Sequence, residues 1–469
     1  MHSSPNASRS TNHLTRRRLL QAGALGLLGL DLPQFLKASA TGPTDSSRRA
    51  KEKSCIFIVM GGGPSQLDLW DPKPTAPDGI RGPYQPIATA VPGIQVTELL
   101  PRVARLADRY ALIRSMTHQG FDHGAAMHNF LSGQSRPPVD APYIGTVTAK
   151  LRPATRNIPS YVWLQDLEGD SGVGARYTTG GSLGPAYAPL RIGQGLDNPA
   201  TPNFEVKAFA APANVTPERI SGRQQLLVNL DAVQQAREPS APGMTMQHLQ
   251  QRAFDLLTGP QVRQAFAIQQ EPSRIRDRYG WNPLGQNLLM ARRLIEAGVR
   301  LASVTAFCGK SPNAKYGSQG FVVNCWDMHG NGTPIFGNEW NGLGWCAPRF
   351  DQALSALLED LEQRGLLENT LVIAGGEMGR TPQINKNGTG RDHWPPCFTT
   401  LLAGGGIRGG TVHGASDKHA AYVKDNPVTP EDFAATVYQA LGISPETRLG
   451  ADGFTRPAST GQPLLSLLG

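Results

Sequence analysis

The residues best suited to chemistry in this sequence are histidines that share short segments with acidic residues. Seven of the ten histidines lie in segments that directly follow apolar runs with the character of β-strands, namely His118, His123, His128, His329, His393, His413 and His419. Imidazole nitrogens and carboxylate oxygens are ligands for zinc, manganese, calcium and magnesium. A bound divalent metal ion is therefore the chemistry that these residue types indicate first.

The main candidate ligands come from three of these segments. The motif CWDMHG contains Asp327 and His329, GGEMGRTP contains Glu377, and GRDHWP contains Asp392 and His393. A single histidine beside a carboxylate is more often a plain hydrogen-bonded pair. Several such pairs at successive strand ends favour a metal site, which only a folded sheet can assemble from these five residues.

Short buried strands are expected to position these segments. The run SCIFIVM at Ser54–Met60 is almost wholly apolar and is followed by three glycines, which is typical of an inner strand of a parallel sheet. Similar strands are expected at Ala111–Met116, Tyr161–Leu164, Leu301–Phe307, Leu371–Ala374 and Phe398–Ala403. Open α/β sheets bind ligands at the carboxyl ends of their strands, where the candidate residues lie.

Amphipathic patterns between the strands predict helices. Such patterns occur at Gly124–Leu131, Pro217–Gln235, Met246–Leu257, Leu284–Ala297, Arg349–Arg364 and Pro430–Leu441. The alternation predicts an α/β fold, a large sandwich with a mostly parallel central sheet flanked by helices. We expect a single domain with a polar insertion at about 169–214 and a long functional loop at Lys310–Leu343.

The first forty residues have the pattern of an export signal. Arg16-Arg17 precede the apolar, glycine-rich stretch Ala22–Leu30, and Ala38-Ser39-Ala40 follows. This order is typical of a removable signal peptide, and the paired arginines resemble a twin-arginine (Tat) signal. We predict a signal peptide of residues 1–40, export by the Tat translocase, and a mature domain of residues 41–469 in the periplasm or outside the cell, without a stable membrane span. The alternative, a basic amphipathic helix of the mature fold, is disfavoured by the glycines.

Charge and composition narrow the classes of partner. The formal net charge is +8, but residues 1–40 hold five basic residues against one acidic residue, so the rest of the chain is nearly balanced. It has no basic stripe interleaved with aromatics, which disfavours nucleic-acid binding. The five cysteines include no C-x-x-C pair, so a zinc ribbon is excluded. One or two disulfides are open in an oxidising compartment, with the pairing undetermined.

Six motifs occur in order behind the signal: GGGPSQLDLWDPKP, LPRVARLADRYALIRSM, HGAAMHNFLSG, CWDMHGN, NTLVIAGGEMGRTP and GRDHWP. This series resembles the exported bacterial family called domain of unknown function 1501, over essentially all of residues 54–469. The resemblance implies a place in the alkaline phosphatase and sulfatase superfamily. It also implies a large α/β sandwich with one or two metal ions at the strand carboxyl ends.

The sequence departs from the superfamily pattern at the expected catalytic positions. The superfamily places a Cys, Ser or Thr nucleophile nine residues before a Thr-Gly pair, and matching Ser132-Gly133 to that pair puts His123 at the nucleophile position. No Cys-x-Pro-x-Arg core for formylglycine is present. Glu377-Met378 replaces the Asp-His pair, and Asp68 is the stand-in for the first-strand acidic pair. The resemblance thus adds His123 and Asp68 to the candidate site.

With a histidine at the nucleophile position, a covalent seryl or cysteinyl intermediate is not expected. Water activated by the metal would attack instead, and His123 would be the catalytic base or an additional ligand. His128 lies five residues further along a helical pattern, roughly 140° around the axis. We therefore expect only His123 to face the metal.

These features favour a metal-dependent hydrolase of phosphate or sulfate esters, or of a related anionic small molecule or polysaccharide. Arg380 and Arg391 are expected to bind the substrate anion bidentately, with pairing to nearby acids as the alternative. Two other functions stay open. One is a non-catalytic periplasmic binding or assembly protein that keeps the fold without the nucleophile. The other is a lectin-like polysaccharide binder that uses the loop aromatics Trp70, Tyr84, Trp326, Trp340, Trp345 and Trp394.

Overall fold

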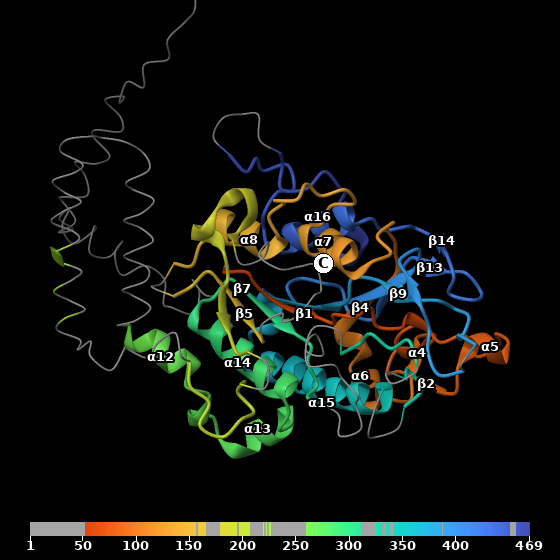
Figure 1. The fold of residues 1–469 in the computed structure, drawn as a ribbon. Helices are drawn as coiled ribbons and strands as arrows, with labels where there is room; N and C mark the ends of the chain where they lie inside the picture. The colour runs from red at the N-terminus through yellow and green to blue at the C-terminus, as the bar shows by residue number, and fades with distance from the viewer. Residues whose placement is uncertain are drawn as a thin grey trace, which may run out of the picture. The chain divides into compact units, whose positions relative to one another are not determined.

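A computed structural model describes most of the chain after residue 51 (Figure 1). The described residues are 52–155, 158–165, 179–194, 197–206, 219, 222, 225, 226, 259–310, 325–330, 334–337, 342–386, 388–450 and 456–469. By its contacts, Lys53–Gly469 forms one compact unit. The predicted signal peptide, the predicted helix Met246–Leu257 and most of Pro217–Gln235 lie outside the described residues.

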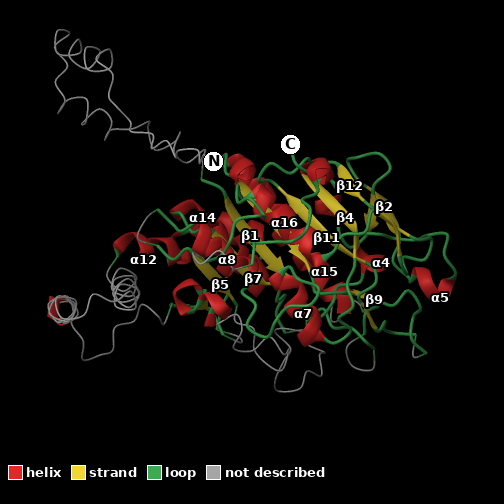
Figure 2. Cartoon of the chain, turned by 90° about the horizontal axis from the view of Figure 1, so that it is seen from above, coloured by secondary structure: helices red, strands yellow, loops and turns green. Residues whose placement is uncertain are grey.

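An eight-stranded sheet crosses this unit in the order β12-β4-β11-β8-β1-β7-β5-β6 (Figures 1 and 2). All neighbouring pairs are parallel except those of β11, which is antiparallel to both β4 and β8. The strands are β1 (Ser54–Val59), β4 (Tyr110–Met116), β5 (Tyr161–Leu164), β6 (Leu190–Ile192), β7 (Leu301–Thr305), β8 (Thr370–Gly375), β11 (Phe398–Ala403) and β12 (Thr411–His413). The predicted α/β fold with a mostly parallel sheet is confirmed.

Helices cover both faces of the sheet, and β1 shows why. Ile56 and Ile58 point into one buried cluster, which α6, α12, α13, α14 and α15 complete. Phe57 points to the opposite face, where its ring packs edge-on against Phe130 of α7 and Phe433 of α16. The longer helices are α7 (His123–Ser132), α8 (Ile144–Leu151), α14 (Pro283–Ala297), α15 (Gly342–Gln363) and α16 (Pro430–Ala440). The shorter ones are α4 (Gln66–Leu69), α5 (Asp78–Arg81), α6 (Pro101–Ala104), α12 (Pro260–Phe266) and α13 (Ser273–Tyr279).

Local signals set the ends of helix α7, which begins at the candidate site. The Asp122 side chain caps it by accepting a hydrogen bond from the Ala125 amide at 2.9 Å. Gly133 ends the helix in the left-handed conformation, with φ of +66°. His123 is therefore held on the first turn of a well-capped helix.

Helix α15 and strand β6 are among the elements that differ from the sequence prediction. Helix α15 begins seven residues before Arg349 and contains Pro348, because burial of Leu343, Cys346 and Ala347 outweighs the backbone hydrogen bond that proline lacks. Strand β6 lies within the segment predicted as an insertion, yet it pairs with β5 at the edge of the sheet.

Three small two-stranded sheets accompany the main one. They are β2 (Pro86–Ala88) with β3 (Gln95–Thr97), β9 (Gly379–Arg380) with β10 (His393–Trp394), and β13 (Ala415–Ser416) with β14 (Val423–Asp425). The pair β9–β10 matters most for the site, because its register sets His393 opposite Arg380.

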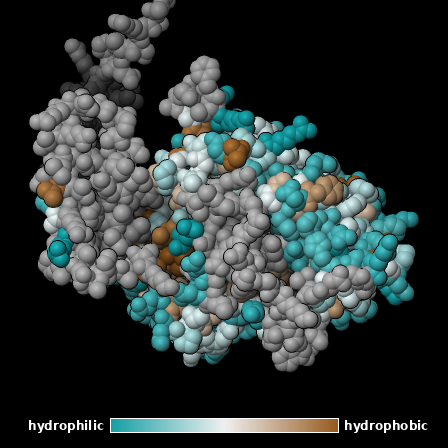
Figure 3. Space-filling model, in the orientation of Figure 1, coloured by the Kyte–Doolittle hydropathy of each residue, from teal (hydrophilic) through white to brown (hydrophobic). Residues whose placement is uncertain are grey.

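The described surface in the view of Figure 3 is mostly hydrophilic, with hydrophobic residues in small separate patches. None of the helices within the described residues has both the length and the apolar character needed to cross a membrane.

Candidate metal centre

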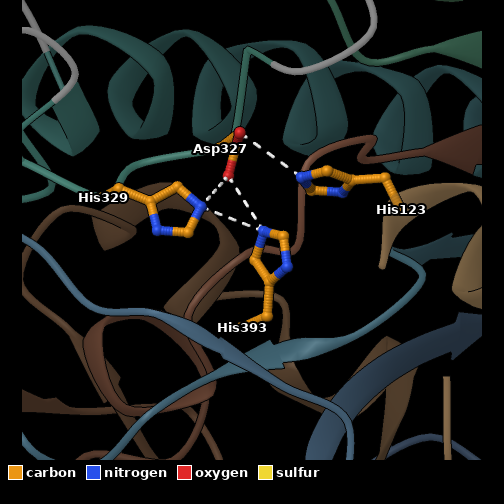
Figure 4. Close-up of side chains that lie close together, drawn as sticks. All are labelled: His123, Asp327, His329 and His393. Atoms are coloured by element: carbon orange, nitrogen blue, oxygen red, sulfur yellow. Dashed lines mark hydrogen bonds and ion pairs between the residues drawn. The ribbon is translucent and has the colours of Figure 1, made fainter. Parts of the chain in front are cut away.

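Four side chains from three parts of the sheet edge meet in one cluster, which we call the His/Asp cluster: His123, Asp327, His329 and His393 (Figure 4). His123 follows β4, Asp327 and His329 follow β7, and His393 comes just before β11. Because β11 runs antiparallel to its neighbours, its amino end lies at the edge where β4 and β7 have their carboxyl ends. The antiparallel direction of β11 thus brings His393, which precedes its strand, close to the residues that follow β4 and β7.

The potential ligand atoms of the His/Asp cluster lie within 4.8 Å of one another. Oδ1 of Asp327 is 2.9 Å from Nε2 of His329 and 3.5 Å from Nε2 of His393, and Oδ2 is 3.3 Å from Nε2 of His123. The Nε2 atoms of His329 and His393 are 3.0 Å apart. Ligands about 2.0–2.2 Å from a tetrahedral zinc ion are separated by about 3.4 Å, so these spacings fit one such ion.

Each of the three histidines is oriented by an oxygen atom on the opposite side of its ring. Nδ1 of His123 is 2.8 Å from Oε1 of Glu377, Nδ1 of His329 is 3.2 Å from Oδ1 of Asp392, and Nδ1 of His393 is 2.8 Å from the Phe121 carbonyl. Carboxylate and carbonyl oxygens only accept hydrogen bonds, so each Nδ1 donates. In the neutral rings the Nε2 lone pairs are then directed into the cluster, which is the usual arrangement of histidines that bind a metal.

Contacts on the Nε2 side support this tautomer assignment. Nη1 of Arg380 is 3.2 Å from Nε2 of His329, and a guanidinium can only donate, so this nitrogen accepts. Nε2 of His123 is buried and forms no well-aligned hydrogen bond within the described residues, although it lies near Asp327. Two unprotonated Nε2 atoms 3.0 Å apart repel each other unless a proton or a cation lies between them. The cluster therefore has the form of a cation site.

The carboxylates of the site favour a bound positive charge, which a proton or a metal ion can supply. Burial lowers the pKa of His123, but the carboxylates of Asp327 and Glu377 outweigh it and raise the pKa to about 9. Burial raises the pKa of Asp327, yet its contacts with the three histidines bring it far below its usual range. Three carboxylates contact the histidines of the cluster, those of Asp327, Glu377 and Asp392, whereas one guanidinium, that of Arg380, contacts the cluster through Asp327 and His329. With neutral histidines, a divalent cation would balance this excess of negative charge.

The His/Asp cluster is also accessible from solvent. The side chain of His329 is 37% exposed, those of Asp327 and His393 are each 22% exposed, and that of His123 is 16% exposed. Structural zinc sites are closed by protein ligands, whereas catalytic sites keep a position for water or substrate. With four protein ligands, water or substrate would approach an ion held here from the exposed side as a fifth ligand.

Two predicted ligands lie behind the histidines and do not join the cluster. Glu377 is fully buried, and its carboxylate accepts hydrogen bonds from the Gly62 amide and from His123. Asp392 is 66% exposed and contacts His329 through Nδ1, the nitrogen directed away from Asp327. Both carboxylates therefore orient a histidine, and neither belongs to the group of potential ligand atoms.

A third predicted ligand, Asp68, is occupied elsewhere. Its Oδ2 accepts from Nε of Arg391 at 2.7 Å and from the Ser65 hydroxyl at 2.5 Å, and its Oδ1 accepts from Nη2 of Arg391 at 3.1 Å. Asp68 and Arg391 are both buried. This bidentate pair lies outside the His/Asp cluster, so Asp68 neutralises an arginine in the core.

The two arginines predicted to bind substrate are saturated by protein acceptors. Arg380 is fully buried and donates to the carbonyls of Gly62, Gly63 and Arg391, to Asp327 and to His329. Arg391 is also fully buried and, besides Asp68, donates to the carbonyls of Ile80, Thr381 and Pro382. A guanidinium has five N–H donors, and all five are used in each case. The alternative interpretation, pairing within the protein, describes both arginines.

The remaining predicted histidines lie outside the His/Asp cluster. His128 faces away from it and contacts the Pro138 carbonyl at 2.8 Å, as the helical period predicts. His118 lies 2.5 Å from the Glu377 carbonyl, and burial lowers its pKa. The Phe121 carbonyl that orients His393 could not be predicted from the sequence, because a main-chain acceptor has no residue-type signal.

Gly62 makes the close approach of the Asp327 segment possible. Its φ is +111°, and a Cβ there would lie 2.8 Å from the Trp326 carbonyl carbon and closer still to the Asp327 amide nitrogen. We expect Gly62→Ala to displace Asp327 and to abolish metal retention, measured by elemental analysis after gel filtration. Gly93→Ala is the matched control, because Gly93 has φ of +88° but no atom within 4 Å of the added Cβ. Equal metal content in both variants would contradict the expectation.

The family model described as "Protein of unknown function (DUF1501)" matches residues 52–463. The chain belongs to this family. None of the curated proteins matches the sequence.

Several solved structures are similar to this chain of the DUF1501 family. PsFucS1 sulfatase from Pseudoalteromonas sp. is 12% identical, with 88% of this chain and 72% of that chain covered and a TM-score of 0.37. The phosphonate monoester hydrolase SpPMH from Silicibacter pomeroyi is 11% identical, with 88% and 76% covered and a TM-score of 0.37. A protein in the alkaline phosphatase superfamily from Vibrio parahaemolyticus is 10% identical, with 84% and 67% covered and a TM-score of 0.36.

Proposed function

We propose that this protein is an exported metal-dependent hydrolase in which His123, Asp327, His329 and His393 hold one divalent cation. One observation carries the proposal: all three histidines donate Nδ1–H to an oxygen, which leaves three Nε2 atoms and one carboxylate within 4.8 Å of one another. The substrate class that we propose is a phosphate or sulfate ester or a related anionic compound.

The donor set favours zinc over the other metals considered. Calcium and magnesium prefer oxygen ligands, whereas three imidazole nitrogens with one carboxylate are typical of zinc and neighbouring first-row metals. Glu377, Asp392 and the Phe121 carbonyl would then act as the outer partners that keep each ring in the correct orientation.

A cation held here would supply Lewis-acid polarisation of an ester oxygen and would acidify a water molecule. The protein's own residues prepare the position for that chemistry. Glu377 accepts the hydrogen bond of the Nδ1 proton of His123, which leaves Nε2 of His123 without a proton. His123 is therefore a metal ligand in this proposal. Within the described residues, no Ser, Thr or Cys side chain hydrogen-bonds to the four members of the His/Asp cluster, which supports attack by water instead of a covalent intermediate.

One observation favours the alternative, a non-catalytic binding or assembly protein that retains the metal. The full set of N–H donors on both Arg380 and Arg391 is used within the protein, so neither offers a free donor to an anion. In that case the cation itself would be the main attraction for an anionic group.

Elemental analysis combined with an activity screen tests the proposal and separates it from the alternative. We expect about one zinc ion per chain, and hydrolysis of an aryl phosphate or aryl sulfate that a chelator abolishes and zinc restores. A metal-loaded protein that hydrolyses neither ester would favour the non-catalytic alternative. Absence of any transition metal from protein purified without chelator, and after incubation with zinc, would contradict both.

We further propose that the chain reaches the periplasm through the Tat translocase, because Arg16-Arg17 stand directly before the apolar stretch Ala22–Leu30. Replacing both arginines by lysine should leave the precursor in the cytoplasm. Cell fractionation and immunoblotting would measure this, with a variant carrying Arg9→Lys as the control for loss of a basic residue. Unchanged export of the double variant would contradict the Tat assignment.

A further inference from the structure

Three of the five cysteines lie together behind the segment that carries Asp327. Cys308 follows β7, Cys325 lies two residues before Asp327, and Cys346 is in α15. All three are reduced and buried, with exposed fractions of 0%, 5% and 2%, respectively. Each thiol contacts a main-chain oxygen of this small region: Cys308 and Cys325 contact the Ala306 carbonyl, and Cys346 contacts the Cys325 carbonyl. We call this group the thiol cluster.

Main-chain contacts show which two thiols are most closely related. Sγ of Cys325 lies 3.0 Å from the Ala306 carbonyl, and Sγ of Cys308 lies 3.8 Å from the same oxygen. Sγ of Cys346 contacts the Cys325 carbonyl at 3.7 Å, and Sγ of Cys308 also lies 3.5 Å from the Cys346 carbonyl. Cys308 and Cys325 are the two thiols of the cluster that share one main-chain acceptor.

The other two cysteines are separate from the thiol cluster. Cys55 belongs to the core on the opposite face of the sheet, and Sγ of Cys397 contacts the Arg114 carbonyl at 3.7 Å. These two provide natural controls, because they are buried thiols with no cysteine partner among the described residues.

Hydrogen bonds connect the thiol cluster to the segment that carries Asp327 and His329 of the His/Asp cluster. Nε1 of Trp326 donates to the Ala306 carbonyl at 2.9 Å, the oxygen that Cys325 also contacts. Cys325 and Trp326 thus hydrogen-bond to Ala306, which directly follows β7. Asp327 and His329 come next in the same segment of the chain. A covalent link at Cys325 would hold that segment in place in the absence of the metal.

We propose that Cys308 and Cys325 form a disulfide after export, with Cys346 remaining a free thiol. In this step the two thiols lose two protons and two electrons as the sulfur–sulfur bond forms, and a disulfide-bearing oxidant of the thiol oxidoreductase or glutathione class is reduced to its two thiols. Export supplies the oxidising compartment, so the inference rests on the proposed localisation and not on hydrolase activity.

The other interpretation treats the three cysteines as small apolar core residues. It predicts five free thiols under all redox conditions. The two interpretations therefore differ in the covalent state of the protein, which can be measured without any assay of activity or metal.

The test uses the full chain equilibrated with an excess of oxidised over reduced glutathione, then denatured and alkylated without reductant. We expect three alkylated cysteines instead of five, an intact mass lower by two hydrogen atoms before alkylation, and a linked peptide pair containing Cys308 and Cys325. Five alkylated cysteines, a link to Cys346, or a mixed disulfide with glutathione alone would overturn the proposal.

Variants check the pairing and its effect on the site. Cys308→Ser and Cys325→Ser should each abolish the link, whereas Cys55→Ser and Cys397→Ser should keep it. If either serine variant of the thiol cluster fails to fold, the peptide map of the unmodified chain still decides. We also expect the reduced form to release zinc to a chelator faster than the oxidised form. Equal release rates would show that the link does not hold the Asp327 segment.

Discussion

Replacing His123 by alanine should remove the bound metal and, with it, any hydrolysis. The residue supplies a buried Nε2 that faces Asp327 and has no other well-aligned partner among the described residues. Loss of an outer partner of a metal ligand typically costs 10–100-fold in metal affinity, so we expect loss of a ligand to cost more than about 100-fold. Competition with a chromogenic zinc chelator measures the affinity directly.

Two further variants, Glu377→Gln and His128→Ala, are compared with His123→Ala. Glu377→Gln keeps an acceptor for Nδ1 of His123 but removes the charge, so we expect about a 10-fold weaker affinity with the metal still present. His128→Ala changes the same helix on its other side, next to Pro138, and should keep the metal while lowering thermal stability. If His128→Ala loses the metal and His123→Ala retains it, the proposed ligand set is wrong.

Replacing Arg292 by methionine should have the largest effect on stability. Its guanidinium is 1% exposed and lies 2.9 Å from Glu271 and 2.9 Å from Asp360, whose side chains are 8% and 4% exposed. Removing one partner of a buried ion pair typically costs 3–5 kcal/mol, because the other charge stays buried. Arg293 and Arg364 still contact these two carboxylates, so we expect the lower end, about 3 kcal/mol, in urea unfolding at pH 7.

The loss should depend on pH. Burial raises the pKa of Glu271 and of Asp360, but their arginine partners outweigh it and leave both values below those of the free side chains. Depressed pKa values stabilise the folded state above the unfolded-state pKa values, near 4.5 and 3.8, and that stabilisation disappears as the pH falls through the lower folded-state values. We therefore expect the difference between the native protein and Arg292→Met to shrink as the pH falls below about 4.

Arg81→Met is the matched control for charge removal. Its ion pair with Asp78 is at the surface, with side chains 49% and 89% exposed, and exposed pairs contribute about 0–1 kcal/mol. A pH-independent loss in Arg292→Met, or an equal loss in Arg81→Met, would contradict the role assigned to the buried ion pairs.

The positions of the strands and of the chemical segments could be predicted from local patterns. The apolar run at Ser54–Met60 is β1 to within one residue, and the runs at Tyr161–Leu164 and Phe398–Ala403 are strands with the predicted bounds. These predictions succeed because buried strands are short, apolar and bounded by turn residues. The motifs were also sufficient to identify the family, and the match of the family model over residues 52–463 confirms that identification.

The direction of a strand is not encoded in such a pattern. The apolar pattern of Phe398–Ala403 predicts a buried strand but not the direction in which that strand runs. Only the pairing with β4 and β8 shows that it is antiparallel to them. For that reason His393, which precedes the strand, reaches the site. His413 instead ends β12, the edge strand of the sheet, and lies near Ser466. Composition likewise cannot tell a metal ligand from a residue that orients one.

What the sequence determined by itself is which residue types are available at the sheet edge: histidines, aspartates, glutamates and arginines in a few loops. Only the tertiary structure decided their roles, by setting which atoms face each other. It turns Nε2 of His123, His329 and His393 toward Asp327, and Glu377 toward the opposite nitrogen of His123. The physical reason is that ligand and partner roles depend on distances of a few ångströms between residues hundreds of positions apart in the chain, and long-range packing alone sets those distances.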